Sequence, residues 1–178
     1  MVARVLWEKG FKEYTEAAEI LKKKYDNLEF QLLGIIDEDN PSGVKRKIIE
    51  NYHEKRIINY LGTSNNVKEV IANCDCIVLP SFYKEGVPRT LMEGAAMEKP
   101  LIATNIQGCK EVVKDNYNGY LCEVKNSQDL IDKMEKFTLL SKEEREKLGK
   151  NGREKMKEKF DINIVIEEYK NIVNKEKE

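Results

Sequence analysis

The chain has 178 residues, of which 40% are hydrophobic, so it is long enough to form one domain with a substantial core. Its 31 Lys and Arg residues almost balance its 32 Asp and Glu residues, and the formal net charge is -1. This balance excludes a general attraction to nucleic acid or to an anionic membrane. Any site for an anionic ligand must therefore be local.

The cysteines and the single histidine do not form a recognisable metal or catalytic motif. Cys74, Cys76, Cys109 and Cys122 lack the spacing of a structural zinc site. We expect reduced, mostly buried thiols in a cytoplasmic protein. His53 lies in a charged helical stretch that does not support a Ser-His-Asp site. No apolar run reaches the roughly 18 residues that a transmembrane helix needs, and no signal peptide is evident.

Hydrophobic periodicity predicts that strands and helices alternate along the chain. The opening residues already have the pattern of a strand, which suggests a piece of a longer protein. The expected strands cover residues 2–6, 28–36, 57–61, 76–79, 101–103 and 120–122. The expected helices cover residues 12–25, 44–52, 67–73, 89–98, 109–113, 127–137 and 142–159, with a last amphipathic helix from residue 162. This alternation predicts an α/β fold, a Rossmann-like parallel sheet flanked by helices.

Capping motifs mark the starts of three helices. Asn66 followed by Glu69, and Ser141 followed by Glu144, have the spacing of a capping box. Ser127 is expected to cap the helix at 127–137. The two helices of residues 141–178 are expected to form a C-terminal helical extension of the domain.

The loops after the strands are the expected place of function, since ligands bind at the carboxyl ends of parallel strands. The loop after the first strand holds Arg4 and Lys9. The loop at 80–88 precedes a helix that starts near Arg89, and a helix start carries unpaired N–H groups and partial positive charge. Together these groups predict a site for a phosphate or diphosphate.

Two acids flank this helix start. Glu85 precedes it and Glu93 lies about one turn inside it. Carboxylates accept hydrogen bonds from sugar hydroxyls, so they suit positions beside a phosphate pocket rather than in it. The spacing fits a ligand of the form sugar–diphosphate–ribose.

The run LPSFYKEGVPRTLMEGAAMEKPLIATNIQGCKEVV resembles the donor-site signature of retaining glycosyltransferases of group 1, also called family 4. It has Pro-Ser, Glu-Gly, a second Glu, a Lys-Pro turn, an apolar strand and a Gly before Glu-Val. The opening ARVLWEKG is similar to the family's Gly-Arg-Leu…Lys-Gly, with Ala3 in place of glycine. The resemblance spans about residues 2–137. Pro88 departs from it, since many members have glycine there, and removes one N–H group.

The resemblance implies one half of a GT-B fold, in which two Rossmann-like domains enclose a cleft. Residues 1–178 would be a single nucleotide-sugar-binding domain, with the N-terminal acceptor domain absent. The catalytic residues that it implies are Glu85, near the transferred sugar, and Arg4 and Lys9, which also contact the diphosphate. The further nucleotide-sugar-binding residues are Tyr60 near the base, Gly86, Val87, Arg89 and Thr90 near the distal phosphate, and Glu93 at the ribose.

The same resemblance implies transfer of a hexose-type sugar, with retention, from a nucleoside diphosphate sugar. UDP is favoured over GDP or ADP, and the acceptor is a saccharide or a lipid-linked sugar of bacterial cell-surface polysaccharide synthesis. No cofactor and no metal are expected, because Arg, Lys and the helix start would stabilise the leaving diphosphate. The full-length protein is expected to be cytoplasmic, with peripheral association at the inner face of the membrane and no nucleic-acid partner.

Two alternatives stay open. One is a nucleotide-sugar epimerase or phosphorylase of related fold. An epimerase would be expected to need further acids and a histidine, for which His53 is poorly placed. A non-enzymatic Rossmann-type binding module of the dinucleotide kind should show Gly-x-Gly-x-x-Gly after the first strand, where this chain has LWEKGF.

Overall fold

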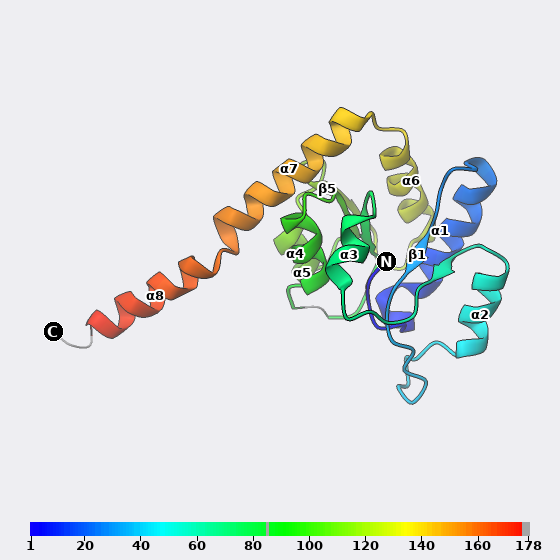
Figure 1. The fold of residues 1–178 in the computed structure, drawn as a ribbon, viewed down its shortest axis with the longest axis horizontal. Coiled ribbons are helices and arrows are strands. Elements are labelled where there is room, and N and C mark those ends of the chain that lie inside the picture. The colour runs from blue at the N-terminus through cyan, green and yellow to red at the C-terminus, as the bar shows by residue number, and fades with distance from the viewer. Residues whose placement is uncertain (85, 176–178) are drawn as a thin grey trace.

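The computed structural model describes residues 1–84 and 86–175 (Figure 1). In this part of the chain, short parallel strands alternate with helices, which confirms the predicted α/β class. The strands are β1 (Gln31–Leu32), β2 (Asn59–Tyr60), β3 (Ile77–Leu79), β4 (Leu101–Thr104) and β5 (Gly119–Cys122). The helices are η1 (Trp7–Lys9, a 3-10 turn), α1 (Phe11–Lys24), α2 (Arg46–Glu54), α3 (Val67–Ala72), α4 (Arg89–Ala96), α5 (Gln107–Val112), α6 (Ser127–Thr138), α7 (Lys142–Lys159) and α8 (Ile162–Lys175).

The strands form two part-sheets, β1-β2 and β3-β4-β5. The expected strands at 2–6 and 28–36 are wrong in extent. Val2 and Val5 make single parallel bridges with Leu33 and Ile36. Of the expected strand at 28–36, only the two residues of β1 form a regular ladder, with β2. Hydrophobic runs predict extended chain well, but a regular ladder also needs a hydrogen-bonded partner strand alongside.

The β3-β4-β5 sheet is covered on both faces, because successive residues of a strand point in opposite directions. Val78 and Ile102 pack in the core that α1 and α6 cover. Ile77 and Leu101 pack in the core formed with α3, α4, α5 and α7. This three-layer arrangement explains why β3 and β4 are continuously apolar.

The capping predictions hold for two helices and are wrong for a third. The side chains of Asn66 and Ser141 accept hydrogen bonds from the third residue of α3 and α7, and Ser141 forms a complete capping box. At α6 the cap is Asn126, whose side chain accepts from Asp129 N at 3.0 Å. Ser127 instead donates its hydroxyl to Glu16 of α1.

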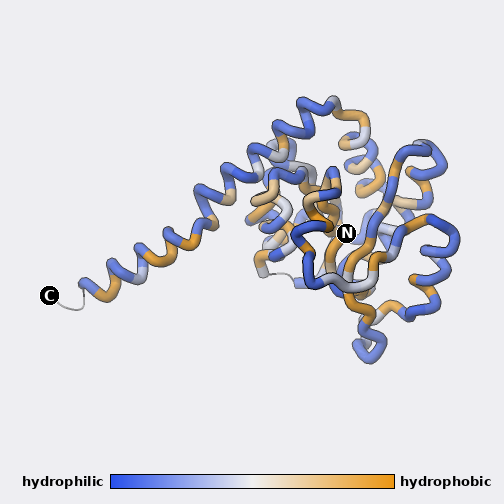
Figure 2. The backbone as a smooth tube through the Cα atoms, viewed as in Figure 1, coloured by the Kyte–Doolittle hydropathy of each residue, from blue (hydrophilic) through white to orange (hydrophobic). Residues whose placement is uncertain are grey.

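The two C-terminal helices differ in their surroundings. α7 packs on α4 with Gly149 and Gly152 buried, whereas α8 extends away from the body (Figure 1). Figure 2 shows apolar positions recurring along α8. The exposed apolar side chains of α8 are Ile162, Ile164, Val165, Ile166, Tyr169, Ile172 and Val173. Within the described residues, no helix is both long and apolar enough to cross a membrane.

Candidate functional site

The Glu8 carbonyl joins the loop after residues 2–6 to the loop after β3. The Glu8 carbonyl accepts from Phe82 N at 2.9 Å, from Tyr83 N at 3.1 Å and from the Ser81 hydroxyl at 3.2 Å. Ser81 is fully buried. Its position and its bonds indicate that it supports the loop and does not face a ligand.

The loop after β4 joins the same cluster. Thr104, the last residue of β4, is buried and donates its hydroxyl to the Ser81 carbonyl. Three loops that follow strands therefore meet at one edge of the sheet, as expected for a doubly wound fold.

Gly10 allows these loops to approach closely. Its φ is +81°, and a Cβ atom built there would lie 2.2 Å from the Pro80 carbonyl oxygen. We expect Gly10→Ala to lower the free energy of unfolding by about 2 kcal/mol, because alanine is strained at positive φ and meets backbone. Urea unfolding measures the loss. The control is Gly86→Ala, where a Cβ atom meets nothing within 4 Å; equal midpoints for the two variants would contradict the prediction.

The two predicted cations lie at this edge of the sheet. Lys9 Nζ lies 4.9 Å from the centroid of the Tyr83 ring. Arg4 Nη1 lies 3.8 Å from Asp37 Oδ2, with side chains 51% and 34% exposed. An exposed ion pair of this kind contributes little free energy, so an anionic ligand can replace Asp37 as the partner of Arg4. Within the described residues, Arg4 makes no hydrogen bond or ion pair with α4.

Among the described residues, the start of α4 carries hydrogen-bonding groups without a partner. Pro88 is the N-cap residue, and no side chain caps the helix. Leu91 and Met92 donate their N–H groups to the Pro88 carbonyl, which leaves the first-turn N–H groups of Arg89 and Thr90 for another acceptor. The buried Thr90 hydroxyl also has no hydrogen-bond partner among the described residues. A buried polar group without a partner costs about 1–3 kcal/mol, so a ligand acceptor here would be favourable.

Glu93 forms an exposed ion pair with Arg89, which lies one turn earlier on α4. Arg89 Nη2 lies 3.6 Å from Glu93 Oε1, and the two side chains are 86% and 43% exposed. Gly86 and Val87 are exposed just before the helix. Glu85 lies outside the described residues, so its role stays a prediction.

Tyr60, at the end of β2, is held in place through both its hydroxyl and its backbone. The hydroxyl donates to the Gly34 carbonyl at 2.9 Å, and burial raises the pKa of the hydroxyl. The Tyr60 N–H donates to His53 Nδ1 at 3.2 Å, a structural role that the sequence did not reveal. A contact of Tyr60 with a base would have to use its ring or the backbone beside it.

Neither a metal cluster nor a deep cavity coincides with the predicted residues. Across residues 1–84 and 86–175, no three His, Cys, Asp or Glu side chains gather as metal ligands do. The cofactor prediction remains untested. A cavity of about 410 Å³ and a second, shallower one are lined by none of the predicted site residues.

The fold is a Rossmann-like α/β domain, in which the loops after the strands meet at one edge of the sheet. Residues 1–155 match the family of glycosyl transferases group 1, and the chain belongs to that family.

Three similar proteins agree with this membership. The chain is 37% identical over 171 residues to N,N'-diacetylbacillosaminyl-diphospho-undecaprenol alpha-1,3-N-acetylgalactosaminyltransferase of Campylobacter jejuni, covering 95% of this chain and 42% of that enzyme. The crystal structure of a glycosyltransferase from Rickettsia africae matches with a TM-score of 0.82 and 27% identity, over 97% of this chain and 45% of that one. The C-terminal domain of a group 1 glycosyl transferase (LpcC) from Francisella tularensis matches with a TM-score of 0.74 and 26% identity, over 89% of this chain and 84% of that one.

Proposed function

We propose that this chain is the donor-binding domain of a retaining glycosyltransferase that takes a hexose-type sugar from a UDP-sugar. The observation that carries the proposal is the start of α4, where two N–H groups and the buried Thr90 hydroxyl lack acceptors among the described residues. A diphosphate supplies such acceptors, and the positive end of the helix favours its charge.

The other residues then take roles around the diphosphate. Arg4 and Lys9 neutralise the charge that develops on the leaving group, without a metal. Glu93 accepts hydrogen bonds from the ribose hydroxyls, and Arg89 lies close enough to hold it in position. Glu85 acts near the transferred sugar, and the base lies close to Tyr60.

The acceptor is proposed to be a lipid-linked saccharide. The Campylobacter relative is named for a transfer to a sugar on diphospho-undecaprenol, and this chain spans 42% of its length. We therefore place acceptor binding on polypeptide outside this chain, and propose that the whole protein works at the inner face of the membrane. The 178-residue chain is expected to bind donor without turnover.

Calorimetric titration of the chain with UDP, GDP, ADP and NAD tests the proposal. We expect selective binding of UDP, weakened about tenfold or more by Glu93→Ala, because two ribose hydroxyls would lose a charged acceptor.

The matched control is Glu111→Ala, which removes an exposed carboxylate of the neighbouring helix α5. Its affinity for UDP should equal that of the unchanged chain. Failure of the folded chain to bind any of the four nucleotides would overturn donor binding by this domain.

A further inference from the structure

The loop after β5 also reaches the edge of the sheet at which the other loops meet. β5 runs parallel to β4, with Cys122 opposite Thr104, so residues 123–126 follow the carboxyl end of β5. Lys125 of this loop places its ammonium 4.5 Å from the centroid of the Phe82 ring, in the loop after β3. Because β4 lies between β3 and β5 in the sheet, the Lys125 side chain joins two loops that are not neighbours.

The aromatic pair of the loop after β3 is held by a cation on each ring. Lys9 lies 4.9 Å from the centroid of the Tyr83 ring, as Lys125 does at 4.5 Å for Phe82. An ammonium over an aromatic ring is attracted by the negative face of the ring. The N–H groups of Phe82 and Tyr83 donate to the Glu8 carbonyl at 2.9 and 3.1 Å. One carbonyl and two cations, from two other loops, therefore fix this loop.

The backbone of Lys125 shows that its placement has an energetic cost. Its φ is +55°, in the left-handed region, where a residue with a Cβ atom is strained and glycine is not. Arg56 and Glu98 share this conformation just past the C-caps of α2 and α4, where helices commonly end in it. Lys125 lies instead in the turn before α6, where glycine or asparagine would be less strained. A lysine held in a strained conformation suggests a role for its side chain.

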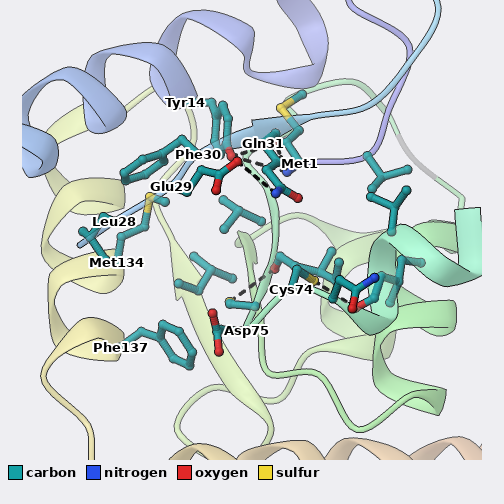
Figure 3. Close-up of a pocket in the computed structure, with 18 of the residues that line it drawn as sticks. Met1, Tyr14, Leu28, Glu29, Phe30, Gln31, Cys74, Asp75, Met134 and Phe137 are labelled. Carbon is teal, nitrogen blue, oxygen red and sulfur yellow. Dashed lines mark hydrogen bonds between the residues drawn. The ribbon is translucent and has the colours of Figure 1, made fainter. Parts of the chain in front are cut away.

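The contact lies away from the cavity shown in Figure 3. That cavity, of about 410 Å³, is lined at the amino ends of the strands by residues such as Glu29 and Asp75, and by neither Lys125 nor Phe82. The loop that Lys125 reaches leads instead from β3 to the start of α4. Fixing residues 80–84 therefore constrains the approach to the candidate ligand site.

We propose that Lys125 is a positioning residue of this site, which holds the Phe82 ring and thereby keeps residues 80–84 in place for the binding of a diphosphate at the start of α4. Lys125 itself does not touch the ligand. A loop that is already ordered loses less conformational freedom on binding, so its ligand is bound more tightly. The effect on the ligand rests on the proposed function, whereas the effect on the loop does not.

Hydrogen exchange of the chain without ligand tests the effect on the loop. Lys125→Met removes the charge and keeps a long side chain. We expect exchange at the Phe82 and Tyr83 amides to become about two- to fivefold faster, the range for loss of an exposed cation–π contact. Lys125→Arg should keep the parent rates, because a guanidinium binds an aromatic face equally well.

The matched control is Lys114→Met. It removes a contact of 4.8 Å between an ammonium and the Tyr117 ring, in the turn before β5. It should leave exchange at Phe82 and Tyr83 unchanged. Parent exchange rates at these two amides in the Lys125→Met chain would overturn the proposal.

Calorimetric titration with UDP separates positioning from simple stabilisation. Lys125→Gly removes the cation and also relieves the strained φ. We expect a urea midpoint no lower than that of the parent chain, together with a Kd for UDP raised about two- to fivefold. Unchanged affinity for UDP in the folded Lys125→Gly chain would overturn the role at the site. If the parent chain bound no nucleotide, the proposed function would fail, and the exchange rates would still decide whether Lys125 holds the loop.

Discussion

Lys9→Ala is expected to lower kcat/KM of the full-length transferase by about 10² to 10³-fold, the usual loss when one donor to a developing oxyanion is removed. In the proposed function, Lys9 faces the leaving diphosphate, whose negative charge grows in the transition state. Its ammonium lies 4.9 Å from the centroid of the Tyr83 ring, and Tyr83 belongs to the loop between β3 and α4. Steady-state kinetics with the UDP-sugar measure the loss.

The control for this experiment is Lys12→Ala. Lys12 is an exposed cation of α1, and its ion pair is a 3.8 Å contact with Glu16 on the same helix. It should change kcat/KM less than twofold, because an exposed pair of this kind contributes little. If the folded Lys9→Ala enzyme kept kcat/KM within threefold of the parent value, Lys9 would not stabilise the leaving group.

The weak ion pairs around this edge suggest how the apo and bound states are connected. Arg4 pairs with Asp37, and Arg89 pairs with Glu93, each at more than 3.5 Å and partly in solvent. In the proposed function, such pairs keep long side chains near the ligand at small energetic cost. A diphosphate can then take the cations, while Glu93 becomes available to hydroxyl groups.

Local patterns in the sequence were sufficient to predict the helices and the fold class. The side-chain cap at Asn66 and the capping box at Ser141 depend on residues three apart, and the apolar faces of the helices depend on residues within two turns. The cover of helices on both faces of β3 and β4 follows from their continuous apolar runs.

The tertiary contacts of the site were less predictable, because they join residues far apart in sequence. The Ser81 hydroxyl donates to the Glu8 carbonyl, 73 residues away in the sequence. Arg4 can pair with Asp37 only when β1 lies beside residues 2–6. Strand lengths were also overestimated. The residues before β1 have strand composition, but on one side they line a cavity and do not face a paired strand.

The free energy of unfolding of the 178-residue chain is expected to rise by roughly 2 kcal/mol between pH 6 and pH 8 from the Met1 amine alone. Burial lowers the pKa of this amine from 8.0 to about 6. Below pH 6, both folded and unfolded states carry the proton, and folding must desolvate an ammonium. Between pH 6 and pH 8, only the unfolded state retains the proton on the amine. Above pH 8, neither state is charged and the full stability is reached.

Acetylation of Met1 isolates this contribution. The groups that face the amine are the Tyr14 hydroxyl, at 3.4 Å, and the thiols of Cys74 and Cys76. Burial raises the pKa values of all three, which moves their titration away from the window between pH 6 and pH 8. Urea unfolding of the acetylated chain should therefore show a rise over that range that is smaller by roughly 2 kcal/mol. An identical rise with and without acetylation would mean that the amine reaches solvent in the folded state.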